Sequence, residues 1–267
     1  FDQAALQPFV QRATEPENGV NEWTPSMDEA LTFLEIVFSE EFMPKVEINA
    51  FELEEDDEPC IILYTDASFH WRQTPQGREP VSFIGVFIFD QKTRKTYRMD
   101  LEMPLEYYSY FPAGLETYVF YGELAGAVAA FYSAPSLFHK RRVIHFVDNA
   151  GALSNMVNGY AHTPGAARLV SMFHLALIAL QVEWFGEWVP SKCNVSDILT
   201  RLERIQELLD QFPDVRDIPL VLPPIGESWE DLTTWARTIR DRAGEDTYDD
   251  NVRAPPSPEP EEWWGGR

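Results

Sequence analysis

The order of strand-like and helix-like segments between residues 60 and 209 constrains the fold of this chain more than any other feature. Three short runs rich in β-branched and aromatic residues come first, and helical and strand-like segments then alternate. The expected strands are 60–65, 81–89, 95–101, 142–147 and 182–189, and the expected helices are 118–131, 150–158, one that opens at Pro164 and one that runs from Asn194 to Leu209. This order predicts an α/β fold with a mixed five-stranded sheet, three antiparallel strands followed by βαβ units, flanked by helices.

Charge separates this segment from its flanks. The chain of 267 residues carries 44 Asp and Glu against 21 Lys and Arg, a net charge of −23, which taken alone argues against nucleic acid as a partner. Residues 61–200 hold 12 acidic and 11 basic side chains, whereas residues 1–60 hold 16 and 2, and residues 201–267 hold 16 and 8. The acidic excess therefore lies in the flanks, and the nearly neutral middle is compatible with a phosphate-rich partner.

Three parts are expected on this basis. Residues 1–59 form an acidic extension with one helix over 27–42, residues 60–212 form the α/β domain, and residues 213–267 form a second extension. That second extension holds one helix over about 228–242 and a tail of prolines and acids that has no apolar residues to bury. Each of the two flanking helices is preceded by a capping box.

The expected setting is intracellular, with cytoplasm and nucleus left open. Cys60 and Cys193 are too few for a disulfide framework or for a zinc site of the Cys-x-x-Cys kind. The longest apolar stretch, residues 169–182, has 14 residues and is too short to span a bilayer, so no membrane partner is expected.

Two aspartates follow strands of the predicted sheet. Asp66 comes directly after the first strand and Asp148 directly after the fourth. Open α/β sheets form their sites at the carboxyl ends of the strands, so the two carboxylates converge if these strands are parallel neighbours. The alternative is that each aspartate ends a strand or caps the next helix.

Two further acids lie on predicted helices. Glu123 is the only charged residue within 118–138 and falls on an apolar helix face. Burying an unpaired carboxylate costs several kcal/mol, roughly, and a metal ion would offset that cost. The alternative is a helix rotated so that Glu123 lies at the rim. Asp197 occupies the first turn of the last predicted helix, where acids are favoured in any case.

Four short motifs surround these acids. They are Tyr64-Thr-Asp66-Ala-Ser68, Gly122-Glu123-Leu124-Ala125, Val147-Asp148-Asn149-Ala-Gly-Ala-Leu153 and Trp188-Val-Pro-Ser-Lys-Cys-Asn194-Val-Ser-Asp197-Ile-Leu-Thr-Arg201. In this order, over residues 60–210, they resemble ribonuclease H, whose active site is such a carboxylate quartet. The last motif is similar to the ending of members linked to retroelement reverse transcriptases, with the tyrosine-recombinase (DIRS-like) group as the suggested one. Many members carry a His before the last helix, and residues 188–194 contain none.

The resemblance implies a ribonuclease H-like fold and a metal-dependent endonuclease that hydrolyses the RNA strand of RNA–DNA hybrids. It implies two Mg²⁺ or Mn²⁺ ions, the oxygen-preferring cations that suit carboxylates. The expected catalytic metal ligands are Asp66 as the bridge between both ions, Glu123 and Asp148 on one ion, and Asp197 on the other. The expected substrate contacts are Ser68, Asn149 and Asn194. The expected partners are the hybrid and a covalently linked reverse transcriptase module.

Three alternatives remain beside this interpretation. A transposase or integrase of the same fold ends in Glu on the last helix and does not need an acid on the first, so Asp197 and Glu123 favour ribonuclease H. A proofreading exonuclease needs Asp-x-Glu in the first strand, and Asp66-Ala-Ser68 lacks it. A catalytically inactive scaffold that binds nucleic acid or protein has no need of the four acids that this chain retains.

Overall fold

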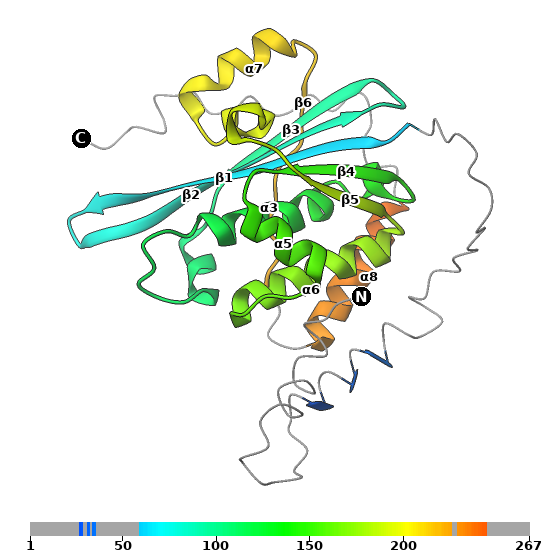
Figure 1. Cartoon of the computed structure of the whole chain (residues 1–267), viewed down its shortest axis with the longest axis horizontal. Helices are drawn as coiled ribbons and strands as arrows, with labels where there is room; N and C mark the ends of the chain where they lie inside the picture. The colour runs from blue at the N-terminus through cyan, green and yellow to red at the C-terminus, as the bar shows by residue number, and fades with distance from the viewer. Residues whose placement is uncertain (1–26, 29–30, 33, 36–58, 226–228, 245–267) are drawn as a thin grey trace.

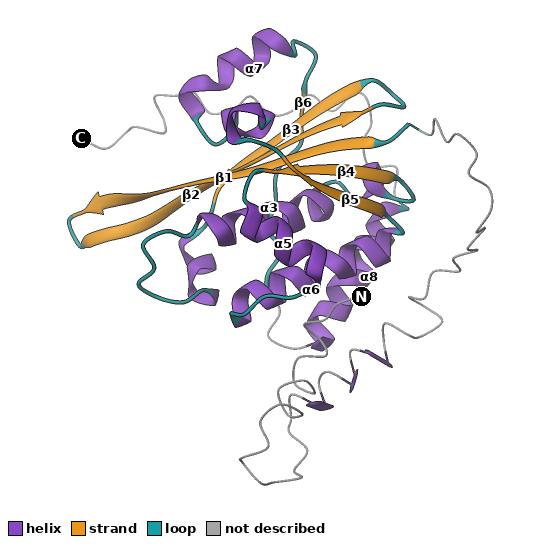
Figure 2. Ribbon diagram, viewed as in Figure 1, coloured by secondary structure: helices purple, strands orange, loops and turns teal. Residues whose placement is uncertain are grey.

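A computed structural model describes residues 27–28, 31–32, 34–35, 59–225 and 229–244. It shows one twisted sheet with helices on both faces (Figure 1, Figure 2). The strands are β1 Ile61–Thr74, β2 Gly77–Asp90, β3 Lys95–Glu102, β4 Arg142–Val147, β5 Glu183–Trp188 and β6 Arg216–Asp217. The helices are α3 Val119–Ser133, α4 Pro135–Phe138, α5 Ala150–Asn158, α6 Pro164–Leu180, α7 Ile205–Gln211 and α8 Trp229–Ala243, with 3₁₀ turns η3 Leu105–Tyr110, η4 Ser191–Cys193, η5 Val195–Ile198 and η6 Leu202–Arg204.

The strands lie in the order β5-β4-β1-β2-β3-β6. The first three strands pair antiparallel, and β4 and β5 run parallel to β1. This confirms the predicted α/β, ribonuclease H-like fold class with its mixed sheet. The sheet has one strand more than the predicted five, because the two-residue β6 pairs with β3. Two residues are too few to produce a detectable period in the sequence.

The first strand is longer than predicted. It does not stop at Asp66 but continues to Thr74, where it turns into β2. The parallel pairing with β4 does stop there, since Thr65 lies opposite Val147 in the last pair. Asp66 is therefore the first residue of β1 without a partner in β4, and it does not end β1. The remaining residues of β1 form a two-stranded ribbon with β2 that projects beyond the sheet (Figure 1).

The helices α3, α5, α6 and α8 cover one face of the sheet (Figure 1). The predicted helices over 118–131 and 150–158, and the one from Pro164, correspond to α3, α5 and α6. The main hydrophobic core lies between this layer and the sheet, and its large, fully buried members include Leu63, Ile84, Leu124, Phe131 and Phe173. α3 is rich in alanine and glycine, which allows it to lie close to β1 and β2.

The prediction of one continuous helix from Asn194 to Leu209 is wrong. The segment after Asn194 consists of the turns η5 and η6 followed by the short helix α7, on the face opposite α3 (Figure 1). A Cβ on Gly85 of β2 would lie 2.7 Å from the carbonyl oxygen of Ser196, so this turn rests directly on the sheet backbone. The Thr200 hydroxyl also donates to the Asp197 carbonyl, three residues earlier. Close packing on β2 and these local hydrogen bonds replace the α-helical pattern, although Ile198 and Leu208 still face the sheet.

The predicted flanking helices are described to different extents. Residues 27–28, 31–32 and 34–35 are helical, and the rest of the predicted helix over 27–42 lies outside the described residues. The acidic residues 52–58 and the tail lie outside them as well. α8 confirms the predicted helix near 228–242 and packs against α6 and α4. The division into three parts stays a prediction. Within the described ranges, no helix has the length and hydropathy needed to cross a membrane.

Candidate metal centre

Three of the four predicted acids meet in space. Asp66, Glu123 and Asp148 each offer a carboxylate oxygen within 4.8 Å of the other two. Register explains the first pair: Thr65 and Val147 are parallel partners, so Asp66 within β1 and Asp148 just after β4 lie side by side. The sequence-based expectation that Asp66 and Asp148 converge therefore matches the structure.

Helix α3 brings Glu123 to the two aspartates. A Cβ on Gly122 would lie 2.7 Å from the Cβ of Ala67, so only glycine permits this approach of helix and strand. The amide nitrogen of Ala67 then donates a hydrogen bond of 3.3 Å to Oε1 of Glu123. Glu123 is 1% exposed, and its Oε2 is buried without a hydrogen-bond partner. The alternative in which Glu123 lies at the rim of the helix is thus wrong, and its carboxylate is buried, as its place on an apolar helix face predicted.

Electrostatics at this cluster favour bound protons or a bound cation. Burial raises the pKa of Glu123 well above its ordinary value, and the charges of Asp66 and Asp148 raise it further. Burial also raises the pKa of Asp66 to about 7, with the charge of Asp148 adding to it, while a hydrogen bond from Thr200 and the charge of Arg201 act in the opposite direction. Three carboxylates this close repel one another unless a positive charge separates them.

The donor set fits a hard divalent cation. All three groups are carboxylates, the ligands that Mg²⁺ and Mn²⁺ prefer. Among the described residues, the buried Oε2 of Glu123 has no hydrogen-bond donor when the cluster is ionised, and a cation would satisfy it. Thr200 holds Oδ2 of Asp66 at 3.0 Å and the Ala67 amide holds Glu123, so the neighbouring groups already fix two of the three side chains.

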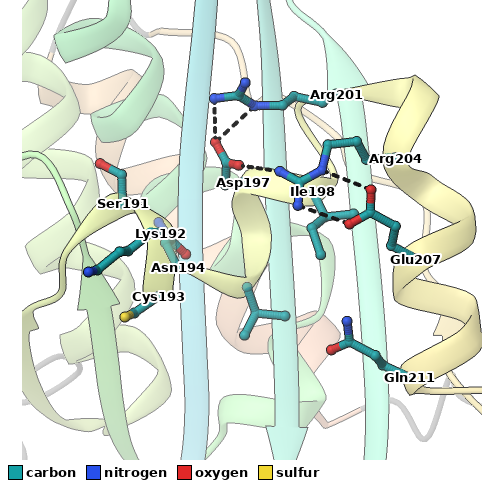
Figure 3. A pocket seen from close by; sticks show the side chains of 11 residues that line it. Ser191, Lys192, Cys193, Asn194, Asp197, Ile198, Arg201, Arg204, Glu207 and Gln211 are labelled. Atoms are coloured by element: carbon teal, nitrogen blue, oxygen red, sulfur yellow. Dashed lines mark hydrogen bonds and ion pairs between the residues drawn. The ribbon is translucent and has the colours of Figure 1, made fainter.

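Asp197, the fourth predicted ligand, has different partners. It lies in η5, where Arg201 donates from Nε and Nη2 to Oδ1 at 3.1 and 2.9 Å (Figure 3). Arg204 donates from Nη1 to Oδ2 at 3.0 Å. Both carboxylate oxygens are therefore paired with guanidinium groups. The structure does not bring Asp197 into the group of three, although its charge still raises the pKa of Asp66.

The predicted substrate contacts all make hydrogen bonds within the protein. The Ser68 hydroxyl donates to the carbonyl of Thr200, and Oδ1 of Asn149 accepts from the amide of Ala152 and so caps α5. Asn194 is 4% exposed, and its amide nitrogen donates to the carbonyl of Thr65. These bonds give the three residues structural tasks, and their contact with a substrate stays a prediction.

Sequence reasoning missed the groups that surround the carboxylates. Thr200 and Arg201 are the last two residues of the fourth motif, but the motif did not predict that they contact Asp66 and Asp197. Arg204 lies beyond that motif. The indole nitrogen of Trp188 donates to the carbonyl of Asp148 at 3.0 Å and steadies the start of the loop after β4. No regular spacing in the sequence indicates this last contact.

Comparisons with known proteins show likeness at the level of solved structures. No family model matches the chain, and no curated protein matches it. The N-terminal RNase H domain of rv2228c from Mycobacterium tuberculosis, solved as a fusion with maltose-binding protein, is 12% identical with a TM-score of 0.38, over 57% of this chain and 99% of that one. RNase H1 from Halobacterium salinarum NRC-1 is 14% identical with a TM-score of 0.38, over 55% and 98%. A foamy viral protease–reverse transcriptase in complex with dsDNA is 12% identical with a TM-score of 0.27, over 70% and 94%. Because these TM-scores are below 0.5, the fold is assigned from the strand order and register of the sheet itself.

Proposed function

We propose that this protein is a metal-dependent endonuclease that hydrolyses the RNA strand of RNA–DNA hybrids. One observation carries the proposal: the carboxylates of Asp66, Glu123 and Asp148 converge within 4.8 Å at the end of a pair of parallel strands. Two of the three acids are almost fully buried, at 5% and 1% exposure, which is costly unless a cation binds there.

The residues that would hold the ion are Asp66, Glu123 and Asp148. Bound divalent cations supply positive charge that stabilises the attacking and leaving oxygens of a phosphodiester and makes a water molecule more acidic. Asp66 would hold the ion together with Glu123 and Asp148, and its role as a bridge between two ions stays a prediction. The hydrogen bonds from Thr200 and from the Ala67 amide keep the ligand oxygens in place.

The choice of substrate rests on the four sequence motifs and their order. A hybrid duplex presents 2′-hydroxyls and phosphates in a shape close to A-form, which a protein reads with little base preference. The last motif supports a place beside a reverse transcriptase module in a retroelement polyprotein, with Mg²⁺ as the working ion. The nearly neutral charge of residues 61–200 supports binding to a polyanion better than the total of −23 suggests.

A second candidate is a nucleic-acid-binding scaffold without catalytic activity. The observation that favours it is the pairing of both oxygens of Asp197 with Arg201 and Arg204, which leaves three acids where the quartet has four. A scaffold would bind the hybrid and leave it intact with either Mg²⁺ or Mn²⁺.

Cleavage of an end-labelled RNA–DNA hybrid with Mg²⁺ separates the two functions. The wild-type protein should cut the RNA strand, and Asp66→Asn and Asp148→Asn should each reduce cleavage to background. Asp210→Asn, which removes an exposed carboxylate from α7, should cleave as the wild type does. Equal cleavage by the wild type and both active-site variants would contradict the site, and intact hybrid in every lane would favour the scaffold.

A further inference from the structure

The two arginines that hold Asp197 are not equivalent. Arg204 is anchored elsewhere, because its Nε and Nη2 donate to Glu207 at 3.2 and 3.0 Å, and only its Nη1 reaches Asp197. Arg201 uses Nε and Nη2 on Asp197, which is its one ion-pair partner among the described residues. Its side chain is 53% exposed. Arg201 can therefore leave Asp197 by giving up a single ion pair whose guanidinium is exposed, while the Asp197 side chain, 18% exposed, keeps its bond to Arg204.

A cavity of about 520 Å³ lies beside this ion pair (Figure 3). Its lining includes the side chains of Lys192, Arg201 and Arg204, with Asp197 and Glu207 as the acids. Three cationic groups against two anionic groups leave one positive charge, in a chain whose overall charge is −23. Without Asp197, the lining would carry three positive charges against one negative charge.

We propose that this cavity binds a backbone phosphodiester of a nucleic-acid strand, and that Arg201 exchanges Asp197 for the phosphate. Arg201 now directs both Nε and Nη2 at the single oxygen Oδ1 of Asp197. The planar guanidinium fork of an arginine can instead bind two oxygens of one phosphate, which a single carboxylate oxygen does not offer. The exchange releases the Asp197 carboxylate beside Asp66, because the Thr200 hydroxyl lies 3.0 Å from Oδ2 of Asp66 and 3.1 Å from the carbonyl oxygen of Asp197. Substrate binding thereby completes the carboxylate quartet. The second half of this inference rests on the proposed nuclease function, whereas the phosphate site does not.

The test is binding of a fluorescent RNA–DNA hybrid to the full chain by anisotropy, in EDTA and over a series of salt concentrations. Arg201→Gln should raise the Kd about tenfold. It should also make the negative slope of log K against log salt shallower by about one, as expected for one lost phosphate contact. The matched control is Arg142→Gln, which breaks an ion pair of 3.1 Å with Glu183 at the start of β4 and β5. That variant should leave the Kd within about twofold and the slope unchanged.

Removing the competing carboxylate tests the exchange itself. Asp197→Asn releases Arg201 for the phosphate and should tighten hybrid binding several-fold in EDTA, whereas Glu183→Gln, which removes the carboxylate that pairs with Arg142, should not. If the arginines only brace the turn, Asp197→Asn will weaken binding or match Glu183→Gln, which overturns the exchange. Equal behaviour of Arg201→Gln and Arg142→Gln, or no hybrid binding by the wild type, overturns the phosphate site.

These outcomes are separable from the nuclease proposal. Hybrid that is cleaved with Mg²⁺, together with equal binding by Arg201→Gln and Arg142→Gln, would remove only this inference. Specific loss of binding in Arg201→Gln, together with uncut hybrid, would leave the phosphate site in place and remove the nuclease.

Discussion

The hydroxyl of Thr200 donates a hydrogen bond of 3.0 Å to Oδ2 of Asp66, linking the turn after β5 to the central strand across 134 residues of sequence. The same hydroxyl lies 3.1 Å from the carbonyl oxygen of Asp197, so its single proton is shared between the two acceptors. Thr200 is 5% exposed, so this contact is protected from water. It orients one of the three converging carboxylates and lowers the pKa of Asp66 against the effect of burial.

Replacing this hydroxyl should weaken the metal centre. Thr200→Val keeps the shape of the side chain and removes the donor, so the Asp66 pKa should rise further and Mn²⁺ affinity should fall by about tenfold, as for other groups that orient metal ligands. Thr200→Ser keeps the donor and is the control. Isothermal titration calorimetry measures the Mn²⁺ affinities. Equal affinities for Thr200→Val and Thr200→Ser would show that the hydrogen bond to Asp66 does not affect metal binding.

In the metal-free protein, Glu123 should lower the free energy of unfolding, and this loss should grow as the pH rises. Its pKa is raised in the folded state, so the folded protein gains stability from its proton at low pH and loses it as pH rises above the ordinary value of 4.5. Without divalent ions, Glu123→Gln should therefore be more stable than the wild type, with a gap that widens from about pH 5 to pH 8. With Mg²⁺ the order should reverse. Urea unfolding measures this, and the exposed Glu116→Gln should show neither effect.

His145 should make the fold sensitive to mild acid. It is fully buried between Thr65 and Trp184, with Nδ1 accepting from the Trp184 indole and Nε2 within 2.8 Å of the Thr65 hydroxyl. Burial lowers the pKa of His145 from 6.5 to about 3. Between these two pH values the unfolded state binds a proton and the folded state does not. Stability should fall by about 2 kcal/mol from pH 7 to pH 5 through this residue alone.

His145→Gln removes this proton linkage. The difference in unfolding free energy between the wild type and the variant should shrink as pH falls from about 7 to 5, because only the wild type loses the His145 contribution. A difference that stays constant over this range would show that His145 is already protonated in the fold or accessible to water.

Gly122 should be needed for the approach of α3 to β1. Gly122→Ala places a Cβ 2.7 Å from the Cβ of Ala67, where the strand cannot easily yield, and should cost about 1–3 kcal/mol of stability. Gly126→Ala is the matched comparison, because its Cβ would meet the Cγ2 methyl of Ile84 at 2.9 Å, which is slightly farther away and one bond farther from the strand backbone than the Cβ of Ala67. Thermal unfolding should rank Gly122→Ala as the less stable variant, and the reverse order would contradict the tight contact.

The sequence predicted what depends on pattern and order. The parallel pairing of β1 with β4 made Asp66 and Asp148 neighbours, and the isolation of Glu123 on an apolar face indicated its burial. The extension of β1 past Asp66 was not predicted, because an Asp after an apolar run was expected to end the strand. The signal was present in the sequence, since Phe69 and Trp71 alternate with the exposed His70 and Arg72.

Side-chain pairing was the other part that the sequence left open. Asp197 has helix-start, metal-ligand and ion-pair explanations that its local sequence does not distinguish. The choice depends on the break between η5 and α7, which brings Arg204 as well as Arg201 within reach of the carboxylate. That break arises from packing against Gly85 of β2, a contact between distant parts of the chain.

The central claim is that Asp66, Glu123 and Asp148 form a divalent metal site. Titration of the full chain with Mn²⁺, followed by electron paramagnetic resonance of the free ion, tests it without any substrate. The wild type should bind Mn²⁺, Asp66→Asn should lose more than about tenfold in affinity, and Asp210→Asn should bind as the wild type does. Equal Mn²⁺ affinity in the wild type and Asp66→Asn would contradict the account.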